Sequence, residues 1–271
     1  MNETLLHHFQ TRQPSIKERI AAGKKFREKF PRINQGDFKP EANRIDPVTI
    51  LEEQAKTRLQ ELVPIRYTRM LTSPFAFLRG SSAIMAADLA IGETTGINVQ
   101  VCGDMHVANF GVFASAERNL IFGINDFDET LPGPWEWDLK RLVTSIVISG
   151  RFLGAHENVC KDGVLAAVRS YRKRMKEYAY MGNMELNYTN IDEMDVLKAM
   201  PTHQKRIKKL LEKTRNKTQM QVLGKLTDII DDKYRLHDDA PFIVHETHTK
   251  SGRTIEEAMD SWLGSYFPSL L

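Results

Sequence analysis

The chain has 271 residues, of which 41% are hydrophobic and 27% are charged, and this balance predicts a folded globular protein rather than a disordered one. Its 38 Lys and Arg residues nearly cancel its 35 Asp and Glu residues, so the total charge predicts no dominant nucleic-acid surface. No apolar stretch approaches the roughly 20 residues that span a bilayer, and the N-terminus has no secretory signal. Two cysteines cannot form a disulfide framework or a four-thiolate zinc site. We therefore expect a cytoplasmic protein of one large domain or two closely packed ones.

The charges are unevenly distributed along the chain. Residues 161–217 contain 14 basic and 7 acidic residues, whereas residues 101–140 contain 2 basic and 7 acidic residues. Clustered carboxylates repel one another and are best tolerated where a cation or a basic partner lies among them. The acidic centre therefore indicates such a partner. The basic residues at 205–217 are interpreted as a solvated helix face, and a nucleic-acid role would rest on that face alone.

The first part of the chain is predicted to be an arm followed by helices. Residues 1–45 are polar, basic and interrupted by prolines, so we expect an N-terminal arm with a helix at residues 16–30. The main domain, residues 46–271, begins at Asp46-Pro47, which is typical of a helix start. Helical spacing of apolar residues continues over residues 48–62, and Pro64 is expected to end that helix.

The rest of the chain predicts mainly helices around a small β element. Residues 73–80 are interpreted as a strand or tight loop, residues 104–119 as a loop, and residues 131–134 as a turn. Strands are expected at residues 98–103, 120–127 and 242–245. Helices are expected at residues 83–93, 135–152, 162–181, 194–226 (broken near Pro201) and 255–262. The fold class is therefore α+β, mainly helical.

Two segments of the acidic centre contain the residue types that phosphoryl transfer requires. Asp104, His106 and Asn109 lie in the predicted loop, and Asp126 and Asp128 follow the second apolar strand. Phosphoryl transfer needs a carboxylate near the attacking hydroxyl, and an amide oxygen and a second carboxylate on the magnesium that neutralises the triphosphate. Mg²⁺ prefers such oxygens together with water and phosphate. We therefore expect Asn109 and Asp126 to face each other, with Asp104 in the same cleft.

This passage resembles the catalytic region of kinase-like enzymes of the aminoglycoside phosphotransferase and choline-kinase type. Their pattern is a Gly-Asp-x-His-x-x-Asn loop, a short hairpin, an Ile-Asp-Phe/Trp sequence and a helix that opens near an Asp. The matches are Gly103, Asp104, His106, Asn109, Ile124, Asp126 and Phe127 (after one inserted Asn), and Trp137-Asp138-Leu139. The resemblance implies the catalytic lobe of a protein-kinase-like fold, in which a small hairpin carries the catalytic loop.

A closer resemblance is to a widespread, largely uncharacterised bacterial family that carries a domain-of-unknown-function label. The strings at residues 73–80, 102–111, 125–130 and 135–142 support this resemblance. It extends from about Arg44 to the C-terminus, and its strongest motifs lie between Arg66 and Ser145.

Carried over residue by residue, the kinase-like resemblance implies a role for each motif residue. Asp104 would be the catalytic base, Asn109 a metal ligand and Asp126 the main metal ligand. Asp138 would hold the catalytic loop from the start of the following helix, or simply cap that helix. His106 would orient the loop or take part in acid–base chemistry.

Two further features have competing interpretations. Asp128 is a third candidate metal ligand or part of a solvated turn. Arg79, Ser81 and Ser82 are candidates for phosphate binding, because an Arg and two hydroxyls at a helix N-terminus favour an anion. The alternative is that Arg79 pairs with a carboxylate and that Ser81 and Ser82 cap the helix at residues 83–93.

We do not find a nucleotide-binding element upstream of Asp104. A kinase needs a glycine-rich loop and a strand Lys for the phosphates. In the resembled family both lie downstream of the catalytic loop, so we expect a C-terminally truncated chain or a separate polypeptide that supplies them. This chain alone is expected to bind ATP weakly or not at all.

Three functions remain open from the sequence. The first is a kinase-like phosphotransferase, or the catalytic-loop half of one, that uses Mg²⁺ and ATP on an unknown small-molecule or protein hydroxyl. The second is a non-catalytic module that binds a metal or ligand. The third is a metal-dependent phosphohydrolase. The sequence does not show the bridging His and Asp ligands, at two-metal spacing, that such an enzyme would use.

Overall fold

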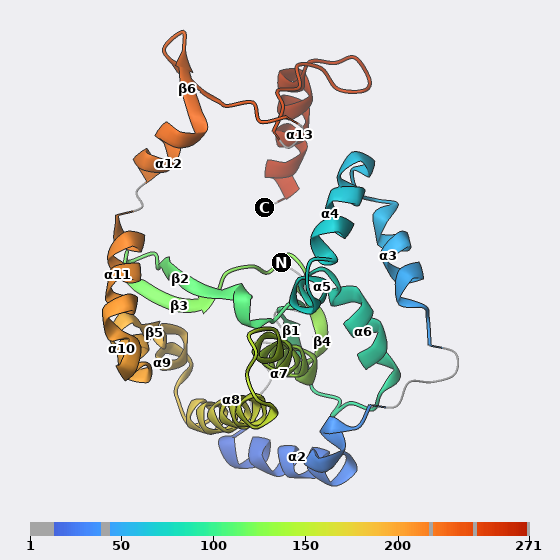
Figure 1. Ribbon diagram of the computed structural model, residues 1–271, viewed down its shortest axis with the longest axis vertical. Coiled ribbons are helices and arrows are strands. Elements are labelled where there is room, and N and C mark those ends of the chain that lie inside the picture. Colours follow the sequence, from blue (N-terminus) through green and yellow to red (C-terminus); the bar gives the residue numbers. More distant parts are fainter. Residues whose placement is uncertain (1–13, 39–43, 217–218, 241–242, 270–271) are drawn as a thin grey trace. The chain divides into compact units, whose positions relative to one another are not determined.

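The computed structural model describes residues 14–38, 44–216, 219–240 and 243–269, and it is mainly helical with small antiparallel sheets (Figure 1). The predicted α+β class is therefore confirmed. The chain divides into two compact units, residues 1–204 and residues 205–271. The first unit contains every residue of the expected site. The expected boundary between an arm and a main domain at residues 45 and 46 stays a prediction.

A complete capping box starts the first described helix, α2 (Ile16–Lys29). The Ser15 hydroxyl accepts a hydrogen bond from the Glu18 backbone N–H, and the Glu18 carboxylate accepts one from the Ser15 backbone at 2.7 Å. The helix predicted at residues 16–30 is therefore confirmed. A short 3₁₀ helix, η1 (Arg32–Gly36), follows after Phe30, whose side chain is buried.

Asp46 caps the next helix, α3 (Pro47–Ala55), by accepting hydrogen bonds from two backbone N–H groups of its first turn. The helix predicted for residues 48–62 ends early. A 3₁₀ turn, η2 (Gln60–Leu62), leads directly into α4 (Val63–Met70). The prediction that Pro64 ends a helix was wrong, because Pro64 lies in the first turn of α4. Proline is tolerated there since first-turn N–H groups have no intrahelical partner.

The strand or tight loop predicted for residues 73–80 was also wrong, since this segment forms α5 (Pro74–Gly80). Ser73 caps it by accepting a hydrogen bond from the Ala76 N–H at 3.0 Å. The next helix, α6 (Ser82–Ile91), confirms the prediction for residues 83–93. Its side-chain caps are absent, however: the Ser81 hydroxyl donates backwards to the Leu78 carbonyl at 3.1 Å, and Ser82 is the first helical residue.

A small apolar cluster joins these helices. Leu51 of α3, Met70 of α4 and Ile84 of α6 are buried against one another, and Ile50 and Tyr67 pack on them. The Tyr67 hydroxyl also donates a hydrogen bond to the Leu51 carbonyl at 3.1 Å. Apolar burial therefore fixes α3, α4 and α6 as one layer.

Two small antiparallel sheets surround the expected loop. β1 (Asn98–Val101) pairs with β4 (Leu131–Pro134), and β2 (Phe110–Ala114) forms a hairpin with β3 (Leu120–Ile124) that β5 (Ile191–Asp192) extends. The strands predicted at 98–103 and 120–127 are present but shorter, since β1 ends at Val101 and β3 at Ile124. The turn predicted at 131–134 is a strand, and the loop predicted at 104–119 contains η3 (Val107–Asn109) and β2. Proline is tolerated in β4 because both strands of a two-stranded sheet are edges.

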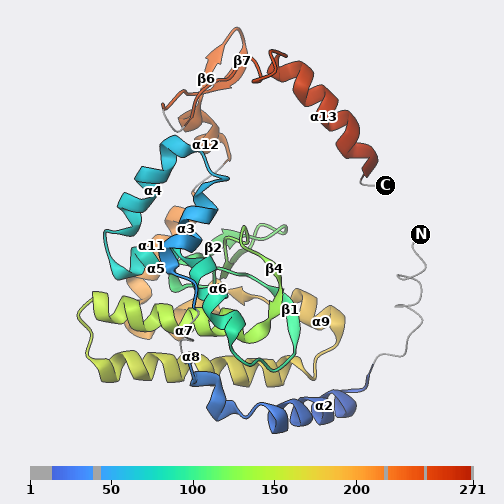
Figure 2. The same ribbon diagram turned by 90° about the vertical axis from the view of Figure 1, so that its right-hand side faces the viewer.

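The two longest helices lie side by side in both Figure 1 and Figure 2. α7 (Trp135–Phe152) occupies the predicted residues, and α8 (Glu157–Tyr178) begins before the predicted residue 162. A Cβ atom on Gly150 would lie 2.6 Å from the Cys160 sulfur, so the two helices approach closely at this glycine. Trp135 also stacks on Tyr171, with ring centroids 5.7 Å apart. These contacts hold α7, which supports the site described below.

Shorter helices follow in the first unit and across its end. They are α9 (Asn183–Tyr188), α10 (Glu193–Ala199), η4 (Pro201–His203) and α11 (Gln204–Arg215). The break predicted near Pro201 is therefore confirmed.

The second unit contains further local elements: α12 (Gln219–Leu226), the hairpin β6 (Thr227–Ile230) and β7 (Lys233–Leu236), and α13 (Ile255–Ser269). The helix predicted at 255–262 is confirmed and is longer than expected. The strand predicted at 242–245 includes Phe242, which lies outside the described residues, and Ile243 forms an isolated bridge with Asp239.

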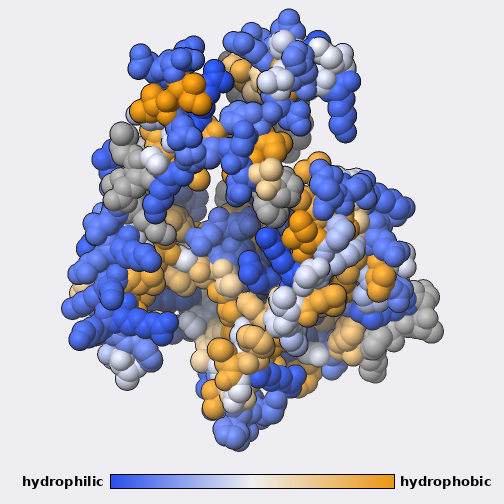
Figure 3. Space-filling model, turned by 45° about the horizontal axis from the view of Figure 1, so that its top comes forward, coloured by the Kyte–Doolittle hydropathy of each residue, from blue (hydrophilic) through white to orange (hydrophobic). Residues whose placement is uncertain are grey.

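Hydrophobic residues at the surface lie between hydrophilic ones on the face drawn in Figure 3. In the part of the chain that the structure describes, no helix has both the length and the apolar character that a membrane crossing requires.

Candidate functional site

The loop between β1 and η3 begins with a glycine in the left-handed region. Gly103 has φ +82°, and a Cβ atom added to it would lie 1.9 Å from the Glu129 carbonyl oxygen. Only glycine permits both this conformation and this close approach of two backbone segments. The loop is therefore directed from β1 towards the segment that follows β3.

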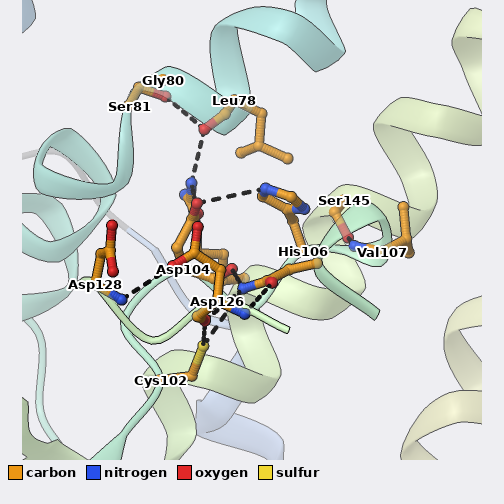
Figure 4. A network of polar contacts seen from close by, with 12 residues as sticks. Leu78, Gly80, Ser81, Cys102, Asp104, His106, Val107, Asp126, Asp128 and Ser145 are labelled. Carbon is orange, nitrogen blue, oxygen red and sulfur yellow. Dashed lines mark hydrogen bonds and ion pairs between the residues drawn. The ribbon is translucent and has the colours of Figure 1, made fainter. Parts of the chain in front are cut away.

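Two polar residues of α7 fix the loop to that helix. The Asp138 carboxylate accepts hydrogen bonds from the backbone N–H groups of Cys102 at 2.7 Å and Gly103 at 3.0 Å. The Ser145 hydroxyl, which is fully buried, accepts one from the Val107 N–H at 3.0 Å (Figure 4). Burial raises the pKa of the Asp138 carboxyl, although the two N–H groups oppose this effect. Asp138 thus holds the start of the loop.

Asn109 joins the loop to the end of β3. Its side-chain N–H₂ donates to the backbone carbonyls of Asp126 at 2.9 Å and Asp104 at 3.1 Å, and its side-chain oxygen accepts from the Asp126 N–H at 2.9 Å. The Asn109 side chain is almost fully buried, at 5% exposure. One amide therefore holds the main chains of both aspartates in a fixed relation (Figure 4).

The Asp104 carboxylate is paired with a buried arginine. Arg141 of α7 donates from Nε to Asp104 Oδ1 at 2.6 Å, and its Nη2 forms a close ion pair with the same oxygen. Arg141 Nη2 also donates to the Leu78 carbonyl of α5 at 2.7 Å, and its side chain is 3% exposed. α5, α7 and the loop therefore meet at this guanidinium.

Burial alone would raise the pKa of the Asp104 carboxyl. The hydrogen bond from His106, together with the charge and hydrogen bonds of Arg141, outweighs burial and holds this pKa below its ordinary value. Asp104 is consequently ionised at neutral pH, although its side chain is only 22% exposed. A carboxylate in this state accepts hydrogen bonds and orients a donor such as a hydroxyl group.

His106 lies beside the Asp104 carboxylate and is 4% exposed (Figure 4). Its Nε2 atom is 3.4 Å from Asp104 Oδ2, and the edge of Phe75 contacts its ring at a centroid distance of 6.0 Å. Its Nδ1 atom is buried and has no hydrogen-bond partner among the described residues. This environment keeps His106 in one orientation against Asp104.

Asp126 and Asp128 lie on an exposed turn after β3. Asp126 Oδ1 accepts a hydrogen bond from the Asp128 backbone N–H at 3.1 Å. The described part of the chain contains no group of three or more His, Cys, Asp or Glu side chains arranged to hold a metal ion. Two exposed carboxylates in one turn suit Mg²⁺, which takes its remaining ligands from water and phosphate. The Asn109 oxygen, in contrast, is directed at the Asp126 main chain, and its predicted role as a metal ligand stays a prediction.

The predicted phosphate-binding residues are only partly connected to this network. The Ser81 hydroxyl is buried and shares the Leu78 carbonyl with Arg141 (Figure 4). Ser82 is half-buried and Arg79 is exposed. Among the described residues, no hydrogen bond joins Arg79 to Asp104, Asp126 or their partners, so phosphate binding by this set stays a prediction.

Sequence reasoning missed Arg141 and Ser145. Together with Asp138 they occupy positions i, i+3 and i+7 of α7, which lie on one helix face. The signal that could have identified them is a row of polar residues at helical spacing within a helix rich in apolar residues. All three are directed at the loop.

Comparison with known proteins identifies the family. Residues 58–269 match the model of a family described as uncharacterised protein conserved in bacteria, DUF2252, and the chain belongs to this family. No curated protein and no solved structure matches the chain. The family resemblance expected from the sequence is thus confirmed, and the resemblance to kinase-like enzymes stays a prediction.

Proposed function

We propose that this member of the DUF2252 family is a kinase-like phosphotransferase that moves a phosphoryl group from Mg-ATP to a hydroxyl acceptor. The observation that carries the proposal is the Asn109 amide, which binds the main chains of Asp104 and Asp126 at once. Phosphoryl transfer depends on positioning and charge neutralisation, so two carboxylates held in a fixed relation are what the reaction requires of a protein.

In this proposal Asp104 accepts a hydrogen bond from the acceptor hydroxyl and takes its proton as the new P–O bond forms. The bond between the γ-phosphorus and its bridging oxygen breaks, and ADP leaves. Because its pKa is lowered, Asp104 is a weak base. It therefore mainly orients the hydroxyl, and the proton moves to it late in the reaction. The pair with Arg141 restricts the carboxylate to one position, and His106 supports it from the buried side.

Asp126 and Asp128 would hold Mg²⁺ on the exposed turn, and Asn109, whose side-chain oxygen accepts the Asp126 N–H, fixes the main chain of that turn behind them. The ion supplies charge neutralisation of the triphosphate when it is bound. The protein contributes two carboxylates and a rigid loop behind them. The backbone N–H groups and the Lys that grip a nucleotide are not among the residues that this proposal assigns.

The metal assignment predicts a stabilising effect. Mg²⁺ or Mn²⁺ at 100 times its dissociation constant should stabilise the folded chain by about 2.7 kcal/mol, because the ion binds only the folded state. Asp126→Asn should abolish the rise in melting temperature, whereas Glu93→Gln, which removes an exposed carboxylate elsewhere, should leave it unchanged. Thermal melts with and without the ion check this, and a rise that survives Asp126→Asn would show that the ligand assignment is wrong.

Transfer itself is tested with ATP labelled at its γ-phosphate, Mg²⁺ and a panel of hydroxyl acceptors. Asp104→Asn should lower the transfer rate by a factor of about 10² to 10⁴, the contribution typical of general base catalysis. Glu93→Gln serves as the control. Full transfer by a folded Asp104→Asn variant would exclude Asp104 from the chemistry.

One observation supports the alternative of a non-catalytic module. The Nε and Nη2 atoms of Arg141 both contact the same Asp104 oxygen, Oδ1. Asp104 therefore also has a structural role, because it pairs with this buried guanidinium. In that case Asp126→Asn should still remove metal binding, while no hydroxyl acceptor would be phosphorylated under any condition that restores nucleotide binding.

A further inference from the structure

Two basic segments that are distant in the sequence lie next to each other in the first unit. Residues 15–36, which form α2 and η1, contain seven Lys and Arg residues and two acidic ones. α8 contains six Lys and Arg residues and three acidic ones. Figures 1 and 2 both show α2 running beside α8. The total charge of +3 hides this surface because acidic segments elsewhere, such as residues 101–140, offset part of its charge.

Three arginines lie on these adjacent segments. Arg27 at the end of α2, Arg32 of η1 and Arg172 of α8 are all exposed, and none has an acidic partner among the described residues. Burial lowers the pKa of Arg32, and the charges of Arg172 and Arg27 lower it further. Like charges at such proximity repel one another, so an anion bound between them would relieve the repulsion.

We propose that this α2–α8 surface, defined by Arg27, Arg32 and Arg172, binds the phosphate backbone of a double-stranded nucleic acid. Guanidinium groups match phosphate oxygens with paired hydrogen bonds. Arg169, Arg172 and Lys176 lie on one face of α8 by their helical spacing. The 22 residues of α8 extend over about 33 Å, which corresponds to about ten base pairs of duplex.

An anionic membrane surface is the competing partner for a basic helix. Membrane-surface helices insert a row of apolar side chains from the exposed face. In α2, Ile16 and Phe26 are partly covered, and Phe30 at its end is buried. Ile20 is 39% exposed, but no exposed apolar residue of α2 lies three or four positions from it. Ile33 and Phe38 are exposed beside η1, but they do not form a helical row. The direction of the α2 side chains therefore favours phosphate contacts over insertion.

The test measures binding of residues 1–271 to a fluorescent DNA duplex and an RNA duplex of about 20 base pairs by anisotropy. The triple variant Arg27→Gln, Arg32→Gln, Arg172→Gln removes the three guanidinium groups. The triple variant Lys205→Gln, Lys208→Gln, Lys209→Gln removes the same charge from the exposed face of α11 and is the control. Circular dichroism establishes that both variants are folded.

At about 50 mM salt, the arginine variant should lose at least about tenfold in affinity for the duplex that wild type binds. Its slope of log K against log salt should fall by about 2–3, since each phosphate contact contributes roughly 0.9. The lysine variant should stay within about twofold of wild type; tighter binding of DNA or RNA identifies which duplex is the ligand. Equal losses in the two variants, no duplex binding by wild type, or arginine-dependent binding only to vesicles with phosphatidylserine would each overturn the proposal.

Discussion

Arg141→Met is expected to lower the free energy of unfolding by about 3 kcal/mol, because removing one partner of a buried ion pair leaves an uncompensated charge. The Arg141 side chain is 3% exposed and bonds both the Asp104 carboxylate and the Leu78 carbonyl. Methionine retains most of the apolar volume but cannot donate to either group. Denaturant unfolding followed by circular dichroism measures the change.

Arg151→Met is the matched control in the same helix. Arg151 pairs with Glu157 through two hydrogen bonds, but the two side chains are 59% and 69% exposed. Exposed ion pairs contribute about 0–1 kcal/mol, so this variant should lose less than about 1 kcal/mol. Similar losses in both variants would mean that Arg141 does not organise the site.

The difference between wild type and Arg141→Met should also depend on pH. The folded-state pKa of Asp104 is held below its ordinary value, so its contribution to stability is complete above about pH 4. The contribution should be lost as the pH falls through the lowered folded-state pKa. The stability difference between the two proteins should therefore be constant near neutrality and shrink in acid.

Gly103→Ala is expected to be the second severe change, with a loss of about 3 kcal/mol or more. A left-handed backbone costs a non-glycine residue about 1–2 kcal/mol. The added methyl group would also lie 1.9 Å from the Glu129 carbonyl oxygen, so the loop and the segment after β3 must separate. The hydrogen bonds of Asn109 between Asp104 and Asp126 would be strained by that separation.

Gly96→Ala distinguishes the cost of a left-handed backbone from the cost of the steric contact with Glu129. Gly96 also has a positive φ, +76°, but an added Cβ atom would meet nothing within 4 Å. This variant should therefore lose only the backbone cost of about 1–2 kcal/mol. Metal-dependent stabilisation should survive in Gly96→Ala and be lost in Gly103→Ala. Equal behaviour of the two variants would argue against a close approach at Gly103.

The local elements were largely readable from the sequence because their signals are local. Asp46-Pro47 predicted a helix start, and the apolar periodicity of residues 135–152 predicted α7 with the observed bounds. The errors fell where one residue type serves two roles. Proline suits both a helix stop and a first turn, which explains Pro64, and it suits both a turn and an edge strand, which explains residues 131–134.

By itself the sequence determined the fold class, the family and the two aspartate-bearing segments, since these depend on residue type and spacing along the chain. The tertiary structure alone decided what those residues contact. It directed the Asn109 amide at two main chains, paired Asp104 with Arg141 and brought α2 next to α8. These hydrogen bonds join residues 5, 17 and 37 positions apart, and α2 and α8 are still farther apart in the sequence. No local pattern specifies such contacts, because burial and packing across several elements select the partner.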